Sequence, residues 1–243
     1  MAININQVYK SVLVVLQQQK RGVLTPTEFN KVATQAQQEI FNDYFDELNQ
    51  MLRQPQTSLA YADRLALLDE KIQIFKRVET LSTNASSSVT PTSQVQELGE
   101  VVYFKISESS GGEGRLVQRI QAYEVYTTNQ SALTKPSELY PVYTYKNNVL
   151  KFYPETELTS GVDNIKLNFL KYPTNVKWGF TIDTELGNYI YNAQSSVDFE
   201  LHQSDQTLLI DKILGYAGVM TRDQLALQLA SQKEQQIDID GQK

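Results

Sequence analysis

The sequence predicts an α+β fold: a helical bundle made by the N- and C-terminal helices, with a small antiparallel β-sheet or barrel inserted between them. Apolar residues recur every three or four positions near both ends of the chain, as on one helix face, and alternate in the middle, as on one strand face. Between the first helical part and the β part, a stretch rich in Ser and Thr carries no charge. We therefore expect N-terminal helices in residues 1–81, a linker in 82–96, a β domain in 97–194, C-terminal helices in 195–236 that pack with the N-terminal bundle, and a tail in 237–243.

The N-terminal part predicts three helices. The first carries its apolar face from Val8 to Leu16 and ends near Gly22, since glycine is common just past helix ends. The second begins at the clearest local signal in the chain, because Thr25 occupies an N-cap position and Glu28 follows three residues later, as in a capping box. A third helix carries the apolar stripe Leu65, Leu68, Ile72, Phe75 and Val78.

The middle of the chain predicts a linker followed by strands. The uncharged residues 80–96 have too little apolar surface to order themselves, so we expect a linker or mobile loop there. A Gly-rich run at 109–114 precedes a strand pattern and not a helix, so it is interpreted as a hairpin turn and not as a phosphate loop. Alternating side chains place strands near residues 101–106, 116–121, 141–145, 149–153 and 165–169.

The C-terminal part predicts a return to helix. Ser204 is placed to cap a helix that ends near Gly218, and a second helix begins at Thr221 or Asp223. The last residues have no helical period, so we expect a tail there.

The composition restricts the chemistry. The chain has 243 residues, no Cys and one His, which excludes disulfides, thiolate nucleophiles and zinc or iron–sulfur sites built on Cys. A net charge of −6 argues against nucleic acid as a tight partner, because phosphates are neutralised by a surplus of Lys and Arg. From this composition we expect no cofactor and no metal. We also expect no membrane partner, since no stretch approaches the roughly 20 apolar residues of a membrane span. The first residues lack the basic and apolar parts of a secretory signal, which favours synthesis in a reducing cytoplasm.

Several short motifs suggest chemistry, and each has a simpler explanation. His202 lies near Asp198 and Ser204, but the sequence lacks the Gly-x-Ser-x-Gly signature, so we interpret it as a surface or capping histidine. Glu155 and Glu157 resemble a glycosidase pair but are interpreted as solvated turn residues. Glu39, Asp43, Asp46 and Glu47 are interpreted as a solvated helix face. Asp238 to Gly241 resemble the opening of a calcium loop but lack the distal Glu that such a loop needs.

The remaining features indicate interaction with another surface. Tyr172, Trp178 and Phe180 concentrate amphipathic aromatic side chains in an irregular segment, and Trp and Tyr are enriched at interface hot spots. The alternative is that Trp178 caps the core of its own domain. The tail residues Ile237, Asp238 and Ile239 form a second candidate, an arm that orders against a neighbour.

A set of short residue strings extends along most of the chain: Ala2–Asn4, Val8–Tyr9, Arg21–Asn30, Gln38–Phe41, Tyr44–Phe45, Asn49, Tyr140–Tyr143, Phe152–Pro154, Lys171–Pro173 before Trp178, Phe199–Leu201 and Leu209–Gly218. With these strings the chain resembles the connector ring proteins of crAss-like phages, and more broadly the head-to-tail adaptor proteins of short-tailed bacteriophages. The resemblance is weakest across residues 82–96 and 106–135, and its motifs contain no catalytic residue.

The resemblance implies a non-enzymatic structural protein of the virion. It implies a subunit of a dodecameric ring. This ring would lie at the head–tail junction beneath the portal, in contact with neighbouring tail or ring proteins. In that family the N- and C-terminal helices join into one bundle and the β part projects from it, while the ring continues the channel through which duplex DNA passes.

The distribution of charge adds a hypothesis about that channel. Residues 1–81 carry no net charge and residues 97–194 carry −2, whereas residues 195–243 carry −4. If the C-terminal part lines the channel, its acidic side chains would repel the DNA phosphates and let the duplex slide.

Three functions from different classes follow from the sequence. The first is a head-to-tail connector that works by symmetric self-association. The second is a peripheral tail or receptor-binding module whose β part recognises a surface ligand. The third is a carboxylate-based hydrolase carried in the tail.

Overall fold

The computed structural model divides the chain into two compact units, which we describe one at a time. A helical unit comprises residues 1–74 and 173–243, and a β unit comprises residues 75–172. The structure describes residues 3–18, 24–53, 59–82, 87–104, 114–137, 140–154, 165–185 and 187–220.

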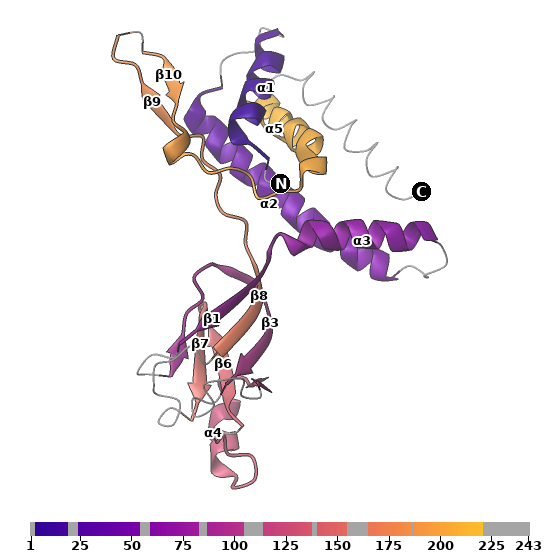
Figure 1. Cartoon of the computed structure of the whole chain (residues 1–243), viewed down its shortest axis with the longest axis vertical. Helices are drawn as coiled ribbons and strands as arrows, with labels where there is room; N and C mark the ends of the chain where they lie inside the picture. The colour runs from indigo at the N-terminus through magenta and orange to yellow at the C-terminus, as the bar shows by residue number, and fades with distance from the viewer. Residues whose placement is uncertain are drawn as a thin grey trace. The chain divides into compact units, whose positions relative to one another are not determined.

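The helical unit contains four of the α-helices in the described part of the chain and one small hairpin (Figure 1). The helices are α1 (Ile5–Gln18), α2 (Pro26–Arg53), α3 (Leu59–Gln73) and α5 (Gln206–Met220); the strands are β9 (Phe180–Ile182) and β10 (Tyr189–Tyr191); two 3₁₀ turns, η1 (Ala193–Ser195) and η2 (Gln203–Asp205), precede α5.

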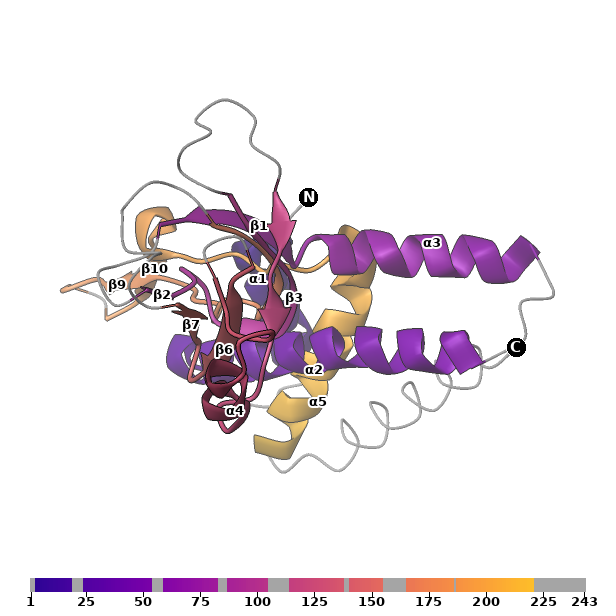
Figure 2. The same ribbon diagram turned by 90° about the horizontal axis from the view of Figure 1, so that it is seen from below.

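Helix α5 packs against both α1 and α2, so the two ends of the described chain share one core. Its buried side chains Leu209, Ile213 and Ala217 are spaced four residues apart and are completely inaccessible to solvent. Burying a large aliphatic side chain in this way contributes about 1.5–3 kcal/mol. Helices α2 and α3 lie side by side (Figure 2). On the other helices the fully or almost fully buried residues are Val8, Val12 and Leu16 in α1 and Phe29, Ala33, Ala36, Ile40 and Tyr44 in α2.

The start of α2 confirms the predicted capping box. The backbone N–H of Thr25 donates to Glu28 Oε2 at 3.0 Å, and the N–H of Glu28 donates to Thr25 Oγ1 at 3.4 Å. The hydroxyl of Thr25 also donates to Glu28 Oε2 at 2.6 Å. These bonds satisfy N–H groups that have no partner within the helix, and the hydroxyl bond in particular lowers the pKa of Glu28.

The described residues of the β unit form two four-stranded sheets and one short helix, α4 (Glu124–Gln130). The first sheet has the order β1-β8-β3-β4 and is antiparallel throughout. The second has the order β2-β7-β6-β5, in which β5 and β6 are parallel. The strands are β1 (Lys76–Leu81), β2 (Ser88–Val89), β3 (Val95–Tyr103), β4 (Arg115–Leu116), β5 (Gln118–Arg119), β6 (Val142–Lys146), β7 (Val149–Tyr153) and β8 (Ile165–Lys171).

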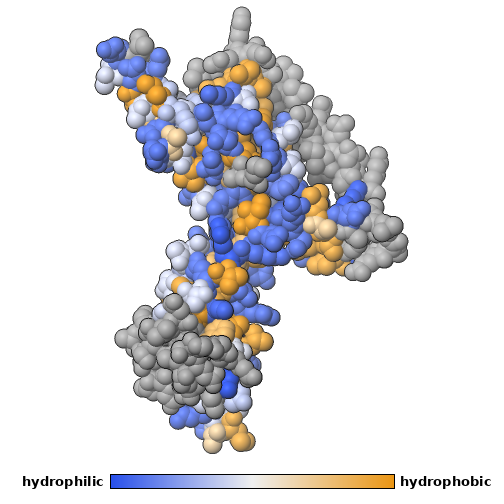
Figure 3. Space-filling model, in the orientation of Figure 1, coloured by the Kyte–Doolittle hydropathy of each residue, from blue (hydrophilic) through white to orange (hydrophobic). Residues whose placement is uncertain are grey.

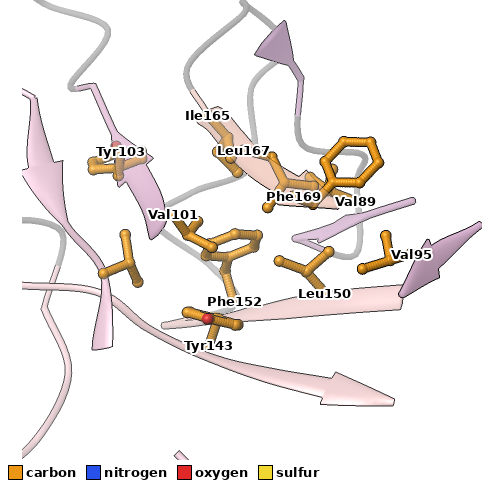
Figure 4. Packing of buried hydrophobic residues seen from close by; sticks show 11 residues of the cluster. Val89, Val95, Val101, Tyr103, Tyr143, Leu150, Phe152, Ile165, Leu167 and Phe169 are labelled. Carbon is orange, nitrogen blue, oxygen red and sulfur yellow. The ribbon is translucent and has the colours of Figure 1, made fainter. Parts of the chain in front are cut away.

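One apolar cluster holds the two sheets together (Figure 4). Strand β8 contributes Ile165, Leu167 and Phe169, which alternate with more exposed residues as the sequence predicted. Leu150 and Phe152 of β7 are completely buried on the opposite side of the cluster. The remaining members are Val89, Val95, Val101, Tyr103, Val117 and Tyr143.

Neither sheet is closed into a barrel among the described strands. The sequence predicted a sheet or a barrel, and the structure has open sheets. The strand expected at residues 116–121 is also divided. Strand β4 pairs with β3 in one sheet, whereas β5 pairs with β6 in the other. Val117 lies between them with its N–H bonded to the carbonyl of Val101 at 2.9 Å, so this segment passes from one sheet to the other.

The third helix is shorter than predicted, because residues 76–81 form β1. All six residues pair with β8, and Val78 is 69% exposed where a buried helical position was expected. The helical spacing of Phe75 and Val78 was therefore misleading.

The prediction of a linker at 82–96 was wrong for the described residues 87–96. Ser88 and Val89 pair with β7, β3 already begins at Val95, and Ser87 is completely buried. The carbonyl of Ser87 accepts a hydrogen bond from the N–H of Phe152 at 2.8 Å. A lack of charge is compatible with burial when the backbone groups are paired, which explains the difference.

The two units divide at residues 74/75 and 172/173, whereas the sequence placed the β domain at 97–194. The hairpin β9–β10 belongs to the helical unit. The second C-terminal helix and the tail predicted beyond Thr221 lie outside the described residues.

Candidate interaction surface

Trp178 lies in the core of the helical unit and is 4% exposed. Its indole ring is 4.4 Å from that of Tyr9, measured between ring centroids, and its Nε1–H donates to Asn6 Oδ1 at 3.2 Å. Its backbone is held by Asn30 of α2, whose Oδ1 accepts from the Trp178 N–H at 2.7 Å and whose amide donates to the Trp178 carbonyl at 3.3 Å. Of the two interpretations left open by the sequence, the structure shows the one in which Trp178 caps its own domain.

A second amide side chain of α2 holds the same region. Gln37 is completely buried, donates from Nε2 to the carbonyl of Thr174 at 2.8 Å and accepts at Oε1 from the N–H of Glu200 at 2.9 Å. The N–H of Thr174 in turn donates to the Glu200 carboxylate at 3.0 Å. Helix α2 therefore fixes the segment that leads to the hairpin and the segment that follows it.

The hairpin β9–β10 continues from this anchor. Phe180 pairs with Tyr191 and Ile182 with Tyr189, so these four apolar or aromatic side chains share one face. Gly187 closes the turn with φ +66°, a conformation that other residues rarely adopt, and its N–H donates to the Asp183 carbonyl at 2.9 Å.

Gly179 allows the base of the hairpin to close. Its carbonyl accepts from the N–H of Asn192 at 2.8 Å, and its N–H donates to Ser196 Oγ at 2.9 Å. A Cβ at this position would overlap Ser195 Oγ and approach the Asn192 carbonyl to 2.9 Å. A residue larger than glycine would therefore push apart the two segments of the chain that meet at the base of the hairpin.

A chain of ring contacts, which we call the aromatic file, connects the core to the hairpin. It runs from Phe29 to Tyr9 (4.7 Å), to Trp178 (4.4 Å), to Phe180 (6.1 Å) and, edge to face, to Tyr189 (5.1 Å). Each such pair contributes about 0.5–1.5 kcal/mol beyond its buried area. Burial raises the pKa of Tyr9, and the nearby Tyr189 raises it further. The hairpin is thus attached to the core by packing as well as by its backbone.

The distal end of the hairpin is exposed and apolar. Ile182 is 60% exposed, Ile190 52% and Tyr189 46%. The turn between the strands carries two carboxylates, Asp183 and Glu185. Hydrophobic surface is visible over this hairpin beside hydrophilic surface (Figure 3). A two-stranded hairpin is marginal in isolation, so an anchored one that exposes an apolar end is a candidate interaction surface.

The residues singled out in the sequence therefore fall into three groups. Trp178 is buried and Phe180 is half-buried, so they anchor the surface and do not form its exposed end. Tyr172 is half-buried and belongs to the β unit. Ile237, Asp238 and Ile239 lie outside the described residues. Sequence reasoning missed Ile182, Tyr189 and Ile190, although alternating apolar residues on both sides of Gly187 were the available signal.

The group most like a catalytic cluster is Tyr44, Lys71 and Asp205. The Tyr44 hydroxyl donates to Asp205 Oδ2 at 2.5 Å, and Lys71 Nζ donates to Asp205 Oδ1 at 2.7 Å. Burial and the adjacent carboxylate both raise the pKa of Tyr44, which is the opposite of what a tyrosinate base requires. The cluster joins α2, α3 and η2, and we assign it a structural role.

His202 confirms the capping interpretation. Its side chain accepts from the N–H of Ser204 and is the N-cap of η2. Asp198 accepts from the backbone N–H of Ile5 at 2.9 Å. Glu155 and Glu157 lie outside the described residues.

Several acidic side chains serve internal contacts. Asp198, Glu200 and Asp205 all accept hydrogen bonds within the helical unit, so these three C-terminal carboxylates stabilise the fold and are poor candidates for a channel lining. On α2, Glu39 and Asp43 lie 3.6 and 3.3 Å from Lys212 of α5. The expected solvated face is therefore partly a helix–helix contact.

In the described ranges no group of three or more His, Asp or Glu is placed to hold a metal ion. Within the same part of the chain, no helix combines the length and the apolarity needed to cross a membrane. No protein-family model matches the chain, and no curated protein matches its sequence.

Replacing Tyr44 with Phe should lower the free energy of unfolding by about 1.5–3 kcal/mol, the usual value for a hydrogen bond to a charged group. The raised pKa of Tyr44 stabilises the fold fully below the unfolded-state value near 10, and this contribution falls as pH rises above it, because only the unfolded tyrosine then ionises. Denaturant titrations at several alkaline pH values should show a shallower decline for Y44F. Tyr123→Phe, at a tyrosine that is 75% exposed, is the matched control. Equal effects of the two variants would contradict the assigned role of Tyr44.

Replacing Asn30 with Ala should loosen the anchor of the hairpin, because both backbone groups of Trp178 lose a partner. Trp178 is the single tryptophan in the chain, so its fluorescence reports this site alone. We expect a red-shifted emission and stronger acrylamide quenching than in the unsubstituted protein. Asn42→Ala, at an exposed position of the same helix, should leave both unchanged. Unaltered quenching in N30A would show that Asn30 does not hold Trp178.

Proposed function

We propose that the protein is a structural subunit of a bacteriophage head-to-tail connector ring, placed beneath the portal and continuing the DNA channel. Its partners in this proposal are further copies of the same chain, arranged as a dodecamer, together with the portal and the neighbouring tail or ring proteins. Duplex DNA is a passing occupant of the channel. The site of action is the head–tail junction of the virion, after synthesis in the host cytoplasm.

The observation that carries the proposal is the arrangement of the two ends of the chain around an inserted β unit. The carbonyl of Ile3 accepts a hydrogen bond from the N–H of Phe199 at 3.2 Å, and α5 packs on both α1 and α2. Residues 75–172 are inserted between these parts as a compact unit of their own. We propose that the N- and C-terminal helices form one bundle and that the β unit is its insertion, as expected from the resemblance to adaptor proteins.

The anchored hairpin provides further support. A ring built from identical copies needs a head-to-tail contact, in which a projecting feature of one copy meets a different surface of the next. The hairpin β9–β10 is held at its base by Asn30 and the aromatic file, and it exposes Ile182 and Ile190 at its end. An apolar feature with a fixed base is suited to a symmetric contact, because little conformational entropy is lost when it docks.

The location of the chain in an assembled particle tests this proposal. We expect a density map of the neck of the virion that incorporates this chain to contain a symmetric ring between capsid and tail into which both units fit. Light scattering of the purified protein measures its size, although a subunit of this kind can remain monomeric until it docks on the portal.

Other locations would contradict the proposal. A trimer at the tip of the tail would favour the alternative, a peripheral tail or receptor-binding module. Glycan hydrolysis abolished by one carboxylate substitution would show that the chain is an enzyme.

A further inference from the structure

We propose that the two chain connections between the helical unit and the β unit form a hinge with one preferred axis, about which the β unit tilts as a rigid body. This inference concerns a motion that is built into the fold. It goes beyond the proposed function, because it does not depend on where the chain is located in a particle.

The two connections lie side by side. One leads from α3 to β1 at residues 74/75, and the other leads from β8 back to the helical unit at residues 172/173. Strands β1 and β8 are adjacent and antiparallel, and their pairing begins with Lys76 opposite Leu170. The chain therefore crosses twice between the units within about one strand spacing, roughly 5 Å. Units joined in this way move relative to each other unless a large apolar interface holds them.

The β unit holds its side of both connections. The side chain of Phe75 is completely buried, and its carbonyl accepts a hydrogen bond from the N–H of Lys171 at 3.0 Å. The N–H of Tyr172 donates to the carbonyl of Gln94, also at 3.0 Å. The ordered backbone of the β unit thus reaches its first and last residues, so the unit can move as one body.

The helical unit holds the other side of each connection. At the end of α3, Ile72 is 4% exposed and Lys71 Nζ donates to Asp205 Oδ1 at 2.7 Å. In the second connection, the carbonyl of Thr174 accepts from Gln37 Nε2 at 2.8 Å. Both connections are therefore fixed to the helices within a few residues of the boundary.

The joint itself is short and stiff. Ile74 lies between α3 and Phe75, and Pro173 lies between Tyr172 and Thr174. Ile74 is half-buried and Pro173 is buried, whereas flexible linkers between domains are exposed. The proline ring fixes φ at about −65° and restricts the preceding residue to extended conformations. We therefore expect a motion of limited range.

The side-by-side connections select the axis of this motion. A rotation about the line from β1 to β8 bends both connections equally and stretches neither. A rotation about any perpendicular axis displaces the two connections in opposite directions, and neither has spare residues to allow it. Hinges of this kind need only a few residues at the ends of secondary-structure elements. In an assembly of identical copies, the hinge would let the β unit adjust to a neighbour while the helical unit stays in place.

Distances between pairs of spin labels test the hinge, and the absence of Cys from the chain restricts labelling to the introduced positions. The pair Asn42→Cys and Tyr126→Cys joins the two units, at exposed positions of α2 and α4. The reference pairs lie within one unit: Asn42→Cys with Asp63→Cys, and Val78→Cys with Tyr126→Cys. We expect double electron–electron resonance to give a wider distance distribution for the pair between units than for either reference pair.

Two variants of the joint show whether it restricts the motion. Insertion of Gly-Ser after Ile74 should widen the distribution between units by several ångströms, because two flexible residues have a reach of roughly 8 Å. Pro173→Ala should widen it less, since only one backbone angle is released. Asn175→Ala, at an exposed position beyond Thr174, is the matched control and should leave the distribution unchanged.

Three results would overturn the inference. Distributions between units that are as narrow as the reference pairs, with and without the insertion, would show that the chain is one rigid body. A distribution in the unsubstituted joint that is as wide as in the insertion variant would show a free linker. Unfolding curves identify a variant that fails to fold, and the insertion and Pro173→Ala are separate routes to the same measurement. Equal widths for Pro173→Ala and Asn175→Ala would contradict the role of Pro173.

Residual dipolar couplings test the axis independently. A lanthanide tag on Asn42→Cys aligns the helical unit, and the couplings of the β unit then report its motion relative to that tag. Backbone N–H bonds of β1 and β8 lie across the strands, along the proposed axis, whereas Cα–C bonds lie more nearly along the strands. We expect the averaging in the β unit to be axially symmetric about the direction from β1 to β8, with the N–H bonds reoriented least. Equal averaging in all directions would contradict a single axis.

The inference and the proposed function fail in different ways. A ring at the neck whose subunits are rigid in the label experiment would reject the hinge and leave the connector proposal intact. A chain located elsewhere in the particle would reject the connector proposal, whatever motion the labels report.

Discussion

The packing of Tyr9 against Trp178 is the contact on which the organisation of the helical unit depends. It joins residues 169 positions apart in the sequence, and it brings α1, α2 and the base of the hairpin together, since Phe29 of α2 packs against the same tyrosine ring. The indole also satisfies its only hydrogen-bond donor on Asn6. Without this contact the hairpin would be attached only through its backbone, and two-stranded hairpins are marginal when they stand alone.

Helix α2 makes this arrangement specific through two amide side chains. Asn30 and Gln37 each donate one hydrogen bond and accept another, and their partners are backbone groups of Trp178, Thr174 and Glu200. An aliphatic residue at either position would leave N–H or carbonyl groups without partners in or near the core, at a cost of about 1–3 kcal/mol for each. The helix thus fixes both the depth of Trp178 and the path of the chain on either side of the hairpin. This is the physical basis for treating the exposed end of the hairpin as a surface with a defined position in its unit.

The features of the fold that depend on neighbours along the chain were predicted from the sequence. The features that depend on distant partners were not predicted. The capping box at Thr25 and the alternation of Ile165, Leu167 and Phe169 were predicted because each depends on neighbours along the chain. Val78 was misassigned because its strand exists only through pairing with β8, and Ser88 and Val89 were missed because their order comes from β7. The interaction residues were misplaced for the same reason. The richest aromatic segment was recognised, but Tyr9 and Asn30 bury its tryptophan, and this leaves the less aromatic Ile182 and Ile190 at the exposed end.

Amide hydrogen exchange measures most directly whether the aromatic file fixes the hairpin to the core. The N–H of Asn192 bonds to Gly179 at the base of the hairpin, and the N–H of Asp183 bonds to Asn188 beside its turn. The account predicts that the Asn192 amide exchanges as slowly as buried amides of α2 and α5, and that Trp178→Ala removes this protection while the β unit keeps its own. An Asn192 amide that exchanges like that of an unstructured peptide in the unsubstituted protein, while α2 and α5 remain protected, would contradict it.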